Sequence, residues 1–132
     1  MAAITKSTSV NIDASSGMYV STISGKLAGE AIAKGDACYI KGSDGKIYRS
    51  INTSANEAAM VHGLAADAAA AGEAVSLYSA GAIWEYSTGM TPGTEVFLGA
   101  VAGGLDTAAG TGHPLPVGHV VDAQRIRISV FQ

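Results

Sequence analysis

Glycine-centred turns cut this chain into short segments, and their spacing limits the possible fold more than any other feature. The stretch AGEAIAKGDACYIKGSDGKIYRS, residues 28–50, is typical. Its glycines accept backbone angles that other residues avoid. Residues 37–40 alternate small and large side chains as a strand does, and Asp44-Gly45 favours a tight hairpin turn. Residues 47–49 then return as a partner strand, so the stretch predicts a β-hairpin.

A similar design recurs later in the chain. Placing Gly35 on Gly93, an offset of 58 residues (93 − 35 = 58), aligns GDACYIKGSDGKI with GTEVFLGAVAGGL. The tetrapeptide Ala-Gly-Glu-Ala at 28–31 also occurs at 71–74. An internal repeat explains these matches, and so does the general likeness of glycine-rich hairpins; the sequence leaves both explanations open.

The rest of the chain reads as further short strands between turns. Strands are expected at 18–23, 61–65, 74–78, 82–86, 96–98, 104–106, 116–121 and 125–131. Residues 57–60 predict one helical turn, and 65–71 predict a short helix or a loop. This spacing predicts an all-β fold over residues 18–132, a small glycine-rich sandwich or barrel-like domain with at most one or two short helices. Residues 1–17 are rich in Ser and Thr and predict a flexible, extended N-terminal arm.

The charge content bears on partners. Charged residues make up 14% of the 132 residues, against roughly 25% in ordinary soluble domains. We expect neighbouring copies to cover part of this neutral surface, as in a homo-oligomer or a larger assembly; a monomer with an unusually neutral surface is the alternative. No Lys or Arg lies between Arg49 and Arg125, so direct binding of DNA or RNA is not expected.

The sequence also bears on the compartment in which the protein is made. It has no run of about 18 apolar residues, which predicts no membrane span. Its N-terminus lacks the basic stretch and apolar core of a signal peptide. We therefore expect a soluble protein that is made in a cytoplasm.

Few residues suggest chemistry. Cys38 is the only cysteine, and its apolar strand predicts a buried, inert thiol. The histidines His62, His113 and His119 lack the clustered spacing of a metal site. Neither a catalytic site, nor a metal site, nor a cofactor site is predicted, although a hydrolase using Cys38 or a histidine remains an alternative of another class.

Trp84 and Tyr86 point to one face of a strand and predict core or subunit-interface packing, with a sugar-stacking platform as the alternative.

Several of these motifs together resemble a known family. Residues 28–40, the stretches VHGLA at 61–65 and AGEAV at 71–75, TPGTEVFL at 91–98, GGL at 103–105 and PVGH at 116–119 resemble, in order and spacing, the capsid decoration (cement, or head-stabilising) proteins of tailed bacteriophages. The likeness covers about residues 17 to 131. It rests on the combination, because each motif alone is only a glycine turn followed by a strand.

The resemblance implies a structural virion protein on the capsid exterior. Such proteins are small β-rich trimers that sit on threefold and quasi-threefold positions of the shell and brace it against packaged DNA. The expected partner is therefore the major capsid protein of a tailed phage. Trp84 and Tyr86 are the candidate trimer interface. A phage fibre or tail-associated β module that binds a receptor or carbohydrate is the alternative.

Family members often reach onto neighbouring subunits with an N-terminal arm, so Thr5, Val10 and Ile12 are candidate capsid-docking residues. Val10 and Ile12 are two positions apart, which on an extended chain places them on one side. A polar arm of this kind would become ordered only against its partner.

Overall fold

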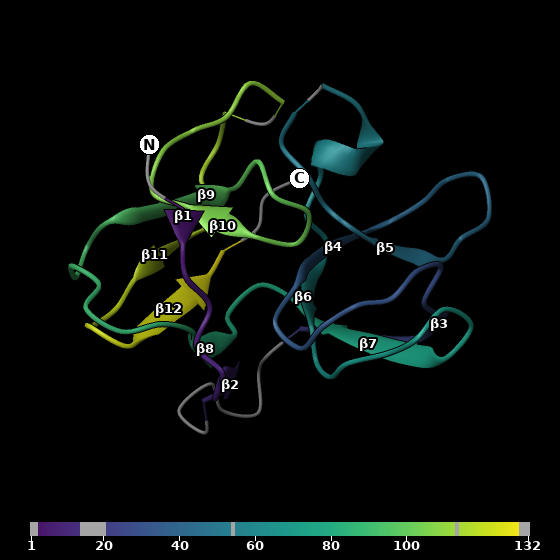
Figure 1. Ribbon diagram of the computed structural model, residues 1–132, viewed down its shortest axis with the longest axis horizontal. Coiled ribbons are helices and arrows are strands. Elements are labelled where there is room, and N and C mark those ends of the chain that lie inside the picture. The colour runs from purple at the N-terminus through teal and green to yellow at the C-terminus, as the bar shows by residue number, and fades with distance from the viewer. Residues whose placement is uncertain (1–2, 14–20, 54, 113, 130–132) are drawn as a thin grey trace.

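The computed structural model describes residues 3–13, 21–53, 55–112 and 114–129, and it confirms the predicted all-β fold (Figure 1). Within these residues the helical structure is one 3₁₀ turn, Glu57–Ala59, at the place where one helical turn was expected. The strands are β1 (Ala3–Ile4), β2 (Asn11–Ile12), β3 (Thr22–Leu27), β4 (Ala37–Ile40), β5 (Ile47–Arg49), β6 (Gly63–Ala65), β7 (Ala74–Tyr78), β8 (Ile83–Glu85), β9 (Glu95–Leu98), β10 (Leu105–Asp106), β11 (Gly118–Val120) and β12 (Arg125–Ile128).

The described strands form two sheets built on one plan. The first has the order β3-β7-β6-β4-β5, and the second contains β8-β12-β11-β9-β10 within a seven-stranded sheet. Numbered from its own first strand, each set of five follows the order 1-5-4-2-3. We call residues 22–78 the first repeat and residues 83–128 the second repeat. Figure 1 shows the two repeats side by side.

The strand registers match as well as the order. Ile40 pairs with Ile47 in the first repeat, and Leu98 pairs with Leu105 in the second. Both residues of the pair therefore recur 58 positions later in the sequence (98 − 40 and 105 − 47). This is the offset at which the two sequences align. A one-residue slip would turn every side chain to the other face. The shared register therefore confirms the internal repeat and goes beyond a general likeness of hairpins.

Backbone hydrogen bonds outside the hairpins repeat too. The N–H of Ala65 donates to the carbonyl of Asp36 at 2.8 Å, and the N–H of Val120 donates to that of Thr94 at the same distance. The two accepting residues, Asp36 and Thr94, are 58 positions apart in the sequence. The two donors, Ala65 and Val120, are only 55 positions apart. The second repeat is therefore three residues shorter between its third and fourth strands, which is why the alignment fades beyond the hairpin.

The N-terminal residues differ from the predicted free arm. Residues 3–13, here called the N-terminal segment, supply both outer strands of the seven-stranded sheet. Strand β1 pairs with β10, and β2 pairs with β8. Val10 is only 8% exposed and packs in the core. The Ser/Thr-rich composition predicted an arm because it offers little apolar area, but Ile4, Val10 and Ile12 provide enough to hold the segment against its own domain. Residues 14–17 of the predicted arm lie outside the described residues.

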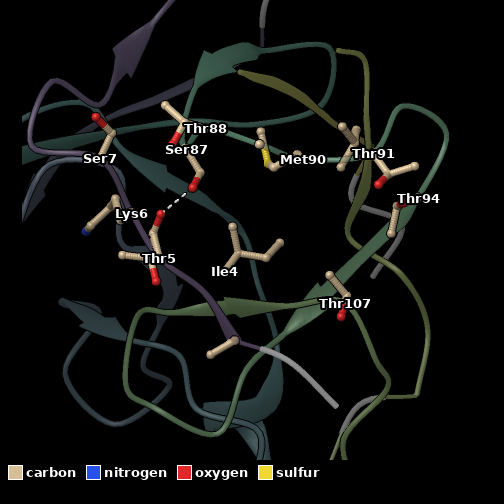
Figure 2. A pocket seen from close by; sticks show the side chains of 13 residues that line it. Ile4, Thr5, Lys6, Ser7, Ser87, Thr88, Met90, Thr91, Thr94 and Thr107 are labelled. Atoms are coloured by element: carbon tan, nitrogen blue, oxygen red, sulfur yellow. Dashed lines mark hydrogen bonds between the residues drawn. The ribbon is translucent and has the colours of Figure 1, made fainter. Parts of the chain in front are cut away.

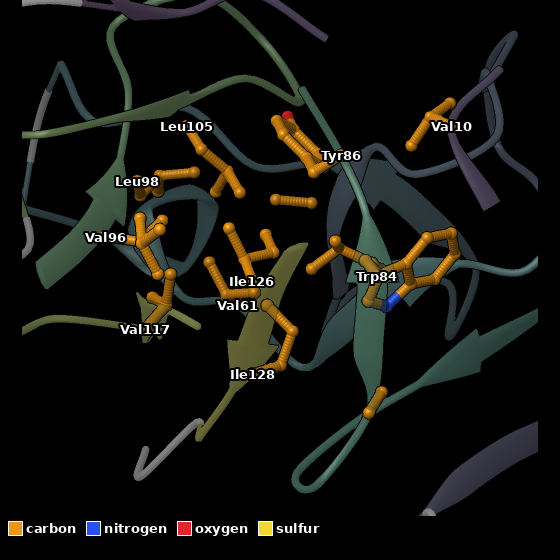
Figure 3. Packing of buried hydrophobic residues seen from close by; sticks show 14 residues of the cluster. Val10, Val61, Trp84, Tyr86, Val96, Leu98, Leu105, Val117, Ile126 and Ile128 are labelled. Carbon is orange, nitrogen blue, oxygen red and sulfur yellow. The ribbon is translucent and has the colours of Figure 1, made fainter. Parts of the chain in front are cut away.

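The buried apolar side chains of the described residues form two clusters. The smaller lies inside the first repeat and includes Ile32, Cys38, Ile47 and Leu77. The larger fills the second repeat and extends between the repeats, where the first repeat contributes Ala37, Val61 and Leu64. Figure 3 shows Val10, Val61, Trp84 and Ile126 within this cluster. The two repeats and the N-terminal segment therefore all contribute to the larger cluster, which we call the shared core.

Local differences from the predicted strands have simple causes. The expected first strand continues to Leu27 instead of ending at Ser24-Gly25, because Gly25 adopts a positive φ of 78° and forms an irregularity between Ile23 and Lys26. Residues 18–20 of that prediction, and Val130 and Phe131 of the last strand, lie outside the described residues. Residues 66–71 form a loop, with an isolated bridge between Ile32 and Ala69.

The repeat supplies a matched pair for a first prediction. Gly45 and Gly103 occupy equivalent hairpin positions with φ of 71° and 77°. A Cβ on Gly45 would meet nothing within 4 Å, whereas one on Gly103 would lie 2.8 Å from Cγ of Asp36 in the other repeat. We expect Gly45→Ala to cost about 1–2 kcal/mol of backbone strain, and Gly103→Ala to cost about 1–3 kcal/mol more from the clash. Urea unfolding of both variants measures this, and equal losses would contradict it.

Candidate functional site

The two repeats close in different ways, and a cavity lies where the second repeat closes. In the first repeat, the chain leaving β3 returns to the opposite edge strand. Ala28 forms a parallel bridge with Ile47, and the N–H of Gly29 donates to the Ile47 carbonyl at 2.8 Å. Ala28 is fully buried at this contact. Its small side chain allows the two backbones to meet directly.

Tyr86 occupies the position of Ala28 in the second repeat. The N–H of Ala28 donates to the carbonyl of Glu73, and the N–H of Tyr86 donates to the equivalent carbonyl of Gln124. The Tyr86 side chain is buried in the core, and no bridge like that of Ala28 with Ile47 forms at this position among the described residues. The N-terminal segment fills the seam at this position, with β1 on β10 and the N–H of Ser7 donating to the Tyr86 carbonyl at 2.7 Å.

A cavity of about 600 Å³ lies beside this seam. The N-terminal segment forms one wall, and the loop 87–91 with Thr94 forms the other. Figure 2 shows Ile4 and Met90 between walls of hydroxyl side chains, with Ser87 Oγ donating a hydrogen bond to the Thr5 carbonyl across the seam. Seven Ser and Thr residues line the cavity: Thr5, Ser7, Ser87, Thr88, Thr91, Thr94 and Thr107.

The charged side chain in the cavity wall is already paired. Lys6 Nζ donates to Asp36 Oδ1 and to the Lys34 carbonyl. Asp36 is only 7% exposed, and its other oxygen accepts the N–H of Ala33 at 2.8 Å. This ion pair ties the N-terminal segment to the first repeat. The cavity itself is lined by neutral hydrogen-bonding groups and a few apolar side chains.

Cys38, predicted to be a buried thiol and considered as a nucleophile only in the alternative reading, is placed unfavourably for catalysis. Cys38 is fully buried, and its thiol donates to the Asp36 carbonyl at 3.3 Å. Burial, with smaller contributions from the Asp36 and Glu30 carboxylates, raises the pKa of Cys38 far above its ordinary value. A thiol that stays protonated is a poor nucleophile, as expected from its apolar strand.

The two histidines that the structure describes lie in different repeats. His62 lies beside β4, with Nδ1 accepting the N–H of Ile40 at 3.0 Å, whereas His119 is exposed on β11. His113 lies outside the described residues. The described residues contain no group of three or more His, Cys, Asp or Glu side chains that could hold a metal ion.

His62 leads to a prediction about pH. Its Nδ1 accepts a hydrogen bond only when it carries no proton, and burial lowers the pKa of His62 below its ordinary value of about 6.5. The unfolded chain therefore binds a proton more readily than the folded one, so stability falls as pH drops below about 6.5. We expect a loss of up to about 1.4 kcal/mol per pH unit there.

Unfolding midpoints between pH 7.5 and 5 test this prediction. The His62→Gln variant should lose most of the slope that wild type shows over this range, whereas the exposed control His119→Gln should keep it. A wild-type slope that survives His62→Gln would contradict the prediction.

The residues predicted to contact other copies or a capsid occupy different places in the fold. Trp84 and Tyr86 are 0% and 1% exposed in the single chain, so they belong to the core and offer no area to a second copy. This corrects their candidate role at a trimer interface and leaves no ring face for a sugar. Val10 and Ile12 face the domain's own core, so they cannot anchor an arm on a capsid. Thr5 is exposed and lines the cavity, so its docking role stays a prediction.

The cavity was missed at the sequence level because nothing in a run of Ser and Thr distinguishes a cavity wall from a surface loop. The helical part of the described chain contains nothing long and apolar enough to span a membrane. Comparison with protein families and with curated proteins finds no match for this chain.

Proposed function

We propose that this protein is a structural virion component that binds the outside of a tailed-phage capsid as a homotrimer, at threefold and quasi-threefold positions, and stabilises the shell. The observation that carries the proposal is that its reactive groups serve its own structure: Cys38 is buried, His62 accepts a backbone hydrogen bond, and Asp36 is paired with Lys6. The closed, duplicated β architecture suits a compact bracing element and agrees with the resemblance to decoration proteins.

The surface chemistry supports self-association. The chain carries little charge. Among the described residues, four large apolar side chains are exposed: Leu27 at 46%, Val101 at 70%, Leu115 at 56% and Val121 at 36%. These side chains replace Trp84 and Tyr86 as candidates for contact with other copies or with the capsid protein. Docking through an N-terminal arm is no part of the proposal, because Val10 and Ile12 are used within the chain.

The test compares capsids with and without the protein. Decorated capsids should release their DNA at a higher temperature than bare capsids, because a brace on the shell opposes the pressure of the packaged genome. Light scattering of the purified protein at micromolar concentration should give a trimer mass. Equal rupture temperatures of bare and decorated particles would overturn the stabilising role, and a monomer mass would overturn the solution trimer.

One observation favours a second candidate. The hydroxyl-lined cavity offers neutral donors and acceptors of the kind that bind polyhydroxylated ligands, which suits a fibre or tail-associated module that binds a carbohydrate. Copy number in purified particles separates the two functions. A decoration protein is present in numbers that scale with the capsid lattice, whereas a tail module is present in only a few copies.

A further inference from the structure

The duplicated architecture shows which strand edges of the two repeats are covered. In the second repeat, β1 covers β10 and β2 covers β8. In the first repeat, the edge of β5 is covered as well: the Ile47 carbonyl accepts the N–H of Gly29, and the N–H of Arg49 donates to the Glu30 carboxylate at 2.9 Å. Three of the four edges therefore have partners within the chain.

The fourth edge, along β3, has no strand on it among the described residues. The carbonyl of Ser21 accepts the N–H of Ser79 at 2.7 Å, on the side of β7. Because backbone groups alternate in direction along an antiparallel strand, the N–H and C=O of the next residue, Thr22, point away from β7. Thr22 and Ser24 are exposed. An edge of this kind is a template for pairing with another strand.

The second repeat shows what fits such an edge. Thr22 pairs with Tyr78 in the first repeat, and Ile83 pairs with Arg127 at the equivalent place in the second. The outward carbonyl of Ile83 accepts the N–H of Asp13 at 2.7 Å, while Ile12 lies opposite Trp84. The residue equivalent to Trp84 is Ile23. A strand on β3 in the same register would therefore place an apolar residue opposite Ile23 and donate to the carbonyl of Thr22.

We propose that the open edge of β3 binds a short extended segment of a second protein, antiparallel and in the register that β2 takes on β8. The segment carries a β-branched apolar residue between two polar ones, as Asn11-Ile12-Asp13 does. Leu27, exposed at the far end of β3, offers an apolar contact to the side chains beyond. The edge accepts such a strand whether or not the protein binds a capsid.

A second copy of this chain fits the edge less well. Its own segment 3–13 is already used in its second repeat. Its β3 carries the irregularity at Ser24-Gly25, so a symmetric β3–β3 pair would bring together two strands that are each regular over only a few residues. Bulges of this kind oppose edge-to-edge pairing of identical chains. Thr22 and Ile23 precede the irregularity, so a strand of two residues can still pair there.

The probe is the synthetic peptide Ser-Val-Asn-Ile-Asp, which copies residues 9–13, added to the wild-type protein labelled with ¹⁵N. Two N-methylated peptides form a matched pair. Methylation at Asp13 removes the donor to Thr22, and methylation at Ile12 alters an N–H that points away from the edge. The protein itself is unchanged, so no variant has to fold.

We expect the peptide to shift the amide signal of Thr22 and to slow its hydrogen exchange. The Asp13-methylated peptide should bind about tenfold more weakly, the effect of one backbone hydrogen bond, and the Ile12-methylated peptide should bind like the parent. The proposal is overturned if the Thr22 amide does not respond at millimolar peptide, or if the response appears at Ile83–Glu85 because the peptide displaces β2. A Thr22 signal that moves with protein concentration alone would assign the edge to a second copy and would also overturn it.

Discussion

Deletion of residues 1–13 is expected to unfold the second repeat. The deletion exposes the edges of β8 and β10 and removes Val10 from the shared core. It also leaves Asp36 as a buried carboxylate without Lys6, and loss of one partner of such a pair costs about 3–5 kcal/mol. The total approaches the whole stability of a small domain, about 5–15 kcal/mol.

Two-dimensional NMR and urea unfolding of the shortened protein measure this effect. The signals of β8–β12 should collapse, while those of the first repeat, which closes through its own Ala28–Ile47 bridge, should persist. Thr8→Ala, a change at an exposed position of the same segment, should leave the unfolding midpoint unchanged. A deletion variant with a native spectrum and midpoint would show that the segment is a dispensable arm after all.

Truncation of Trp84 is expected to produce the second large effect. The side chain is fully buried, and its ring meets that of Tyr78 edge-on at a centroid distance of 6.1 Å, at the junction of the two repeats. Trp84→Ala should cost about 3–5 kcal/mol, because it removes this packing and leaves a cavity. The indole N–H has no hydrogen-bond partner among the described residues.

Trp84→Phe is the matched control. It keeps most of the ring and removes an unpaired donor whose burial costs about 1–3 kcal/mol, so its unfolding free energy should stay close to that of wild type. A Trp84→Ala protein that unfolds normally but changes its association state would restore the interface interpretation of this residue.

The hairpins could be predicted from the sequence because their signals are local. Asp44-Gly45 fixes a turn, and the alternation in Arg125–Ile128 fixes which side chains are buried. The repeat was visible for the same reason, at the positions where both copies keep a glycine turn. The buried state of Cys38 also followed from the apolar residues beside it in β4.

The closure of the second repeat could not be predicted, since it depends on contacts between distant residues. Whether a Ser/Thr-rich segment hangs free or lies against its own domain depends on the open edges of β8 and β10, with which it pairs, and these edges exist only in the folded chain. Trp84 was predicted to pack in a core or at an interface, and only the arrangement of the repeats distinguishes these outcomes.

The pairing of β1 with β10 sets an order for folding on the ribosome. The first repeat is continuous in sequence and closes by itself, so it can fold as soon as residue 78 has emerged. Residues 3 and 4 leave the ribosome before either repeat, yet their partners are Asp106 and Leu105; Ala3 must wait for a residue 103 positions later (106 − 3 = 103). Long-range pairing of this kind slows folding and leaves apolar surface open to aggregation while the chain is incomplete. A ribosome that stalls between the two repeats would therefore hold a folded first half with its N-terminal strands unpaired.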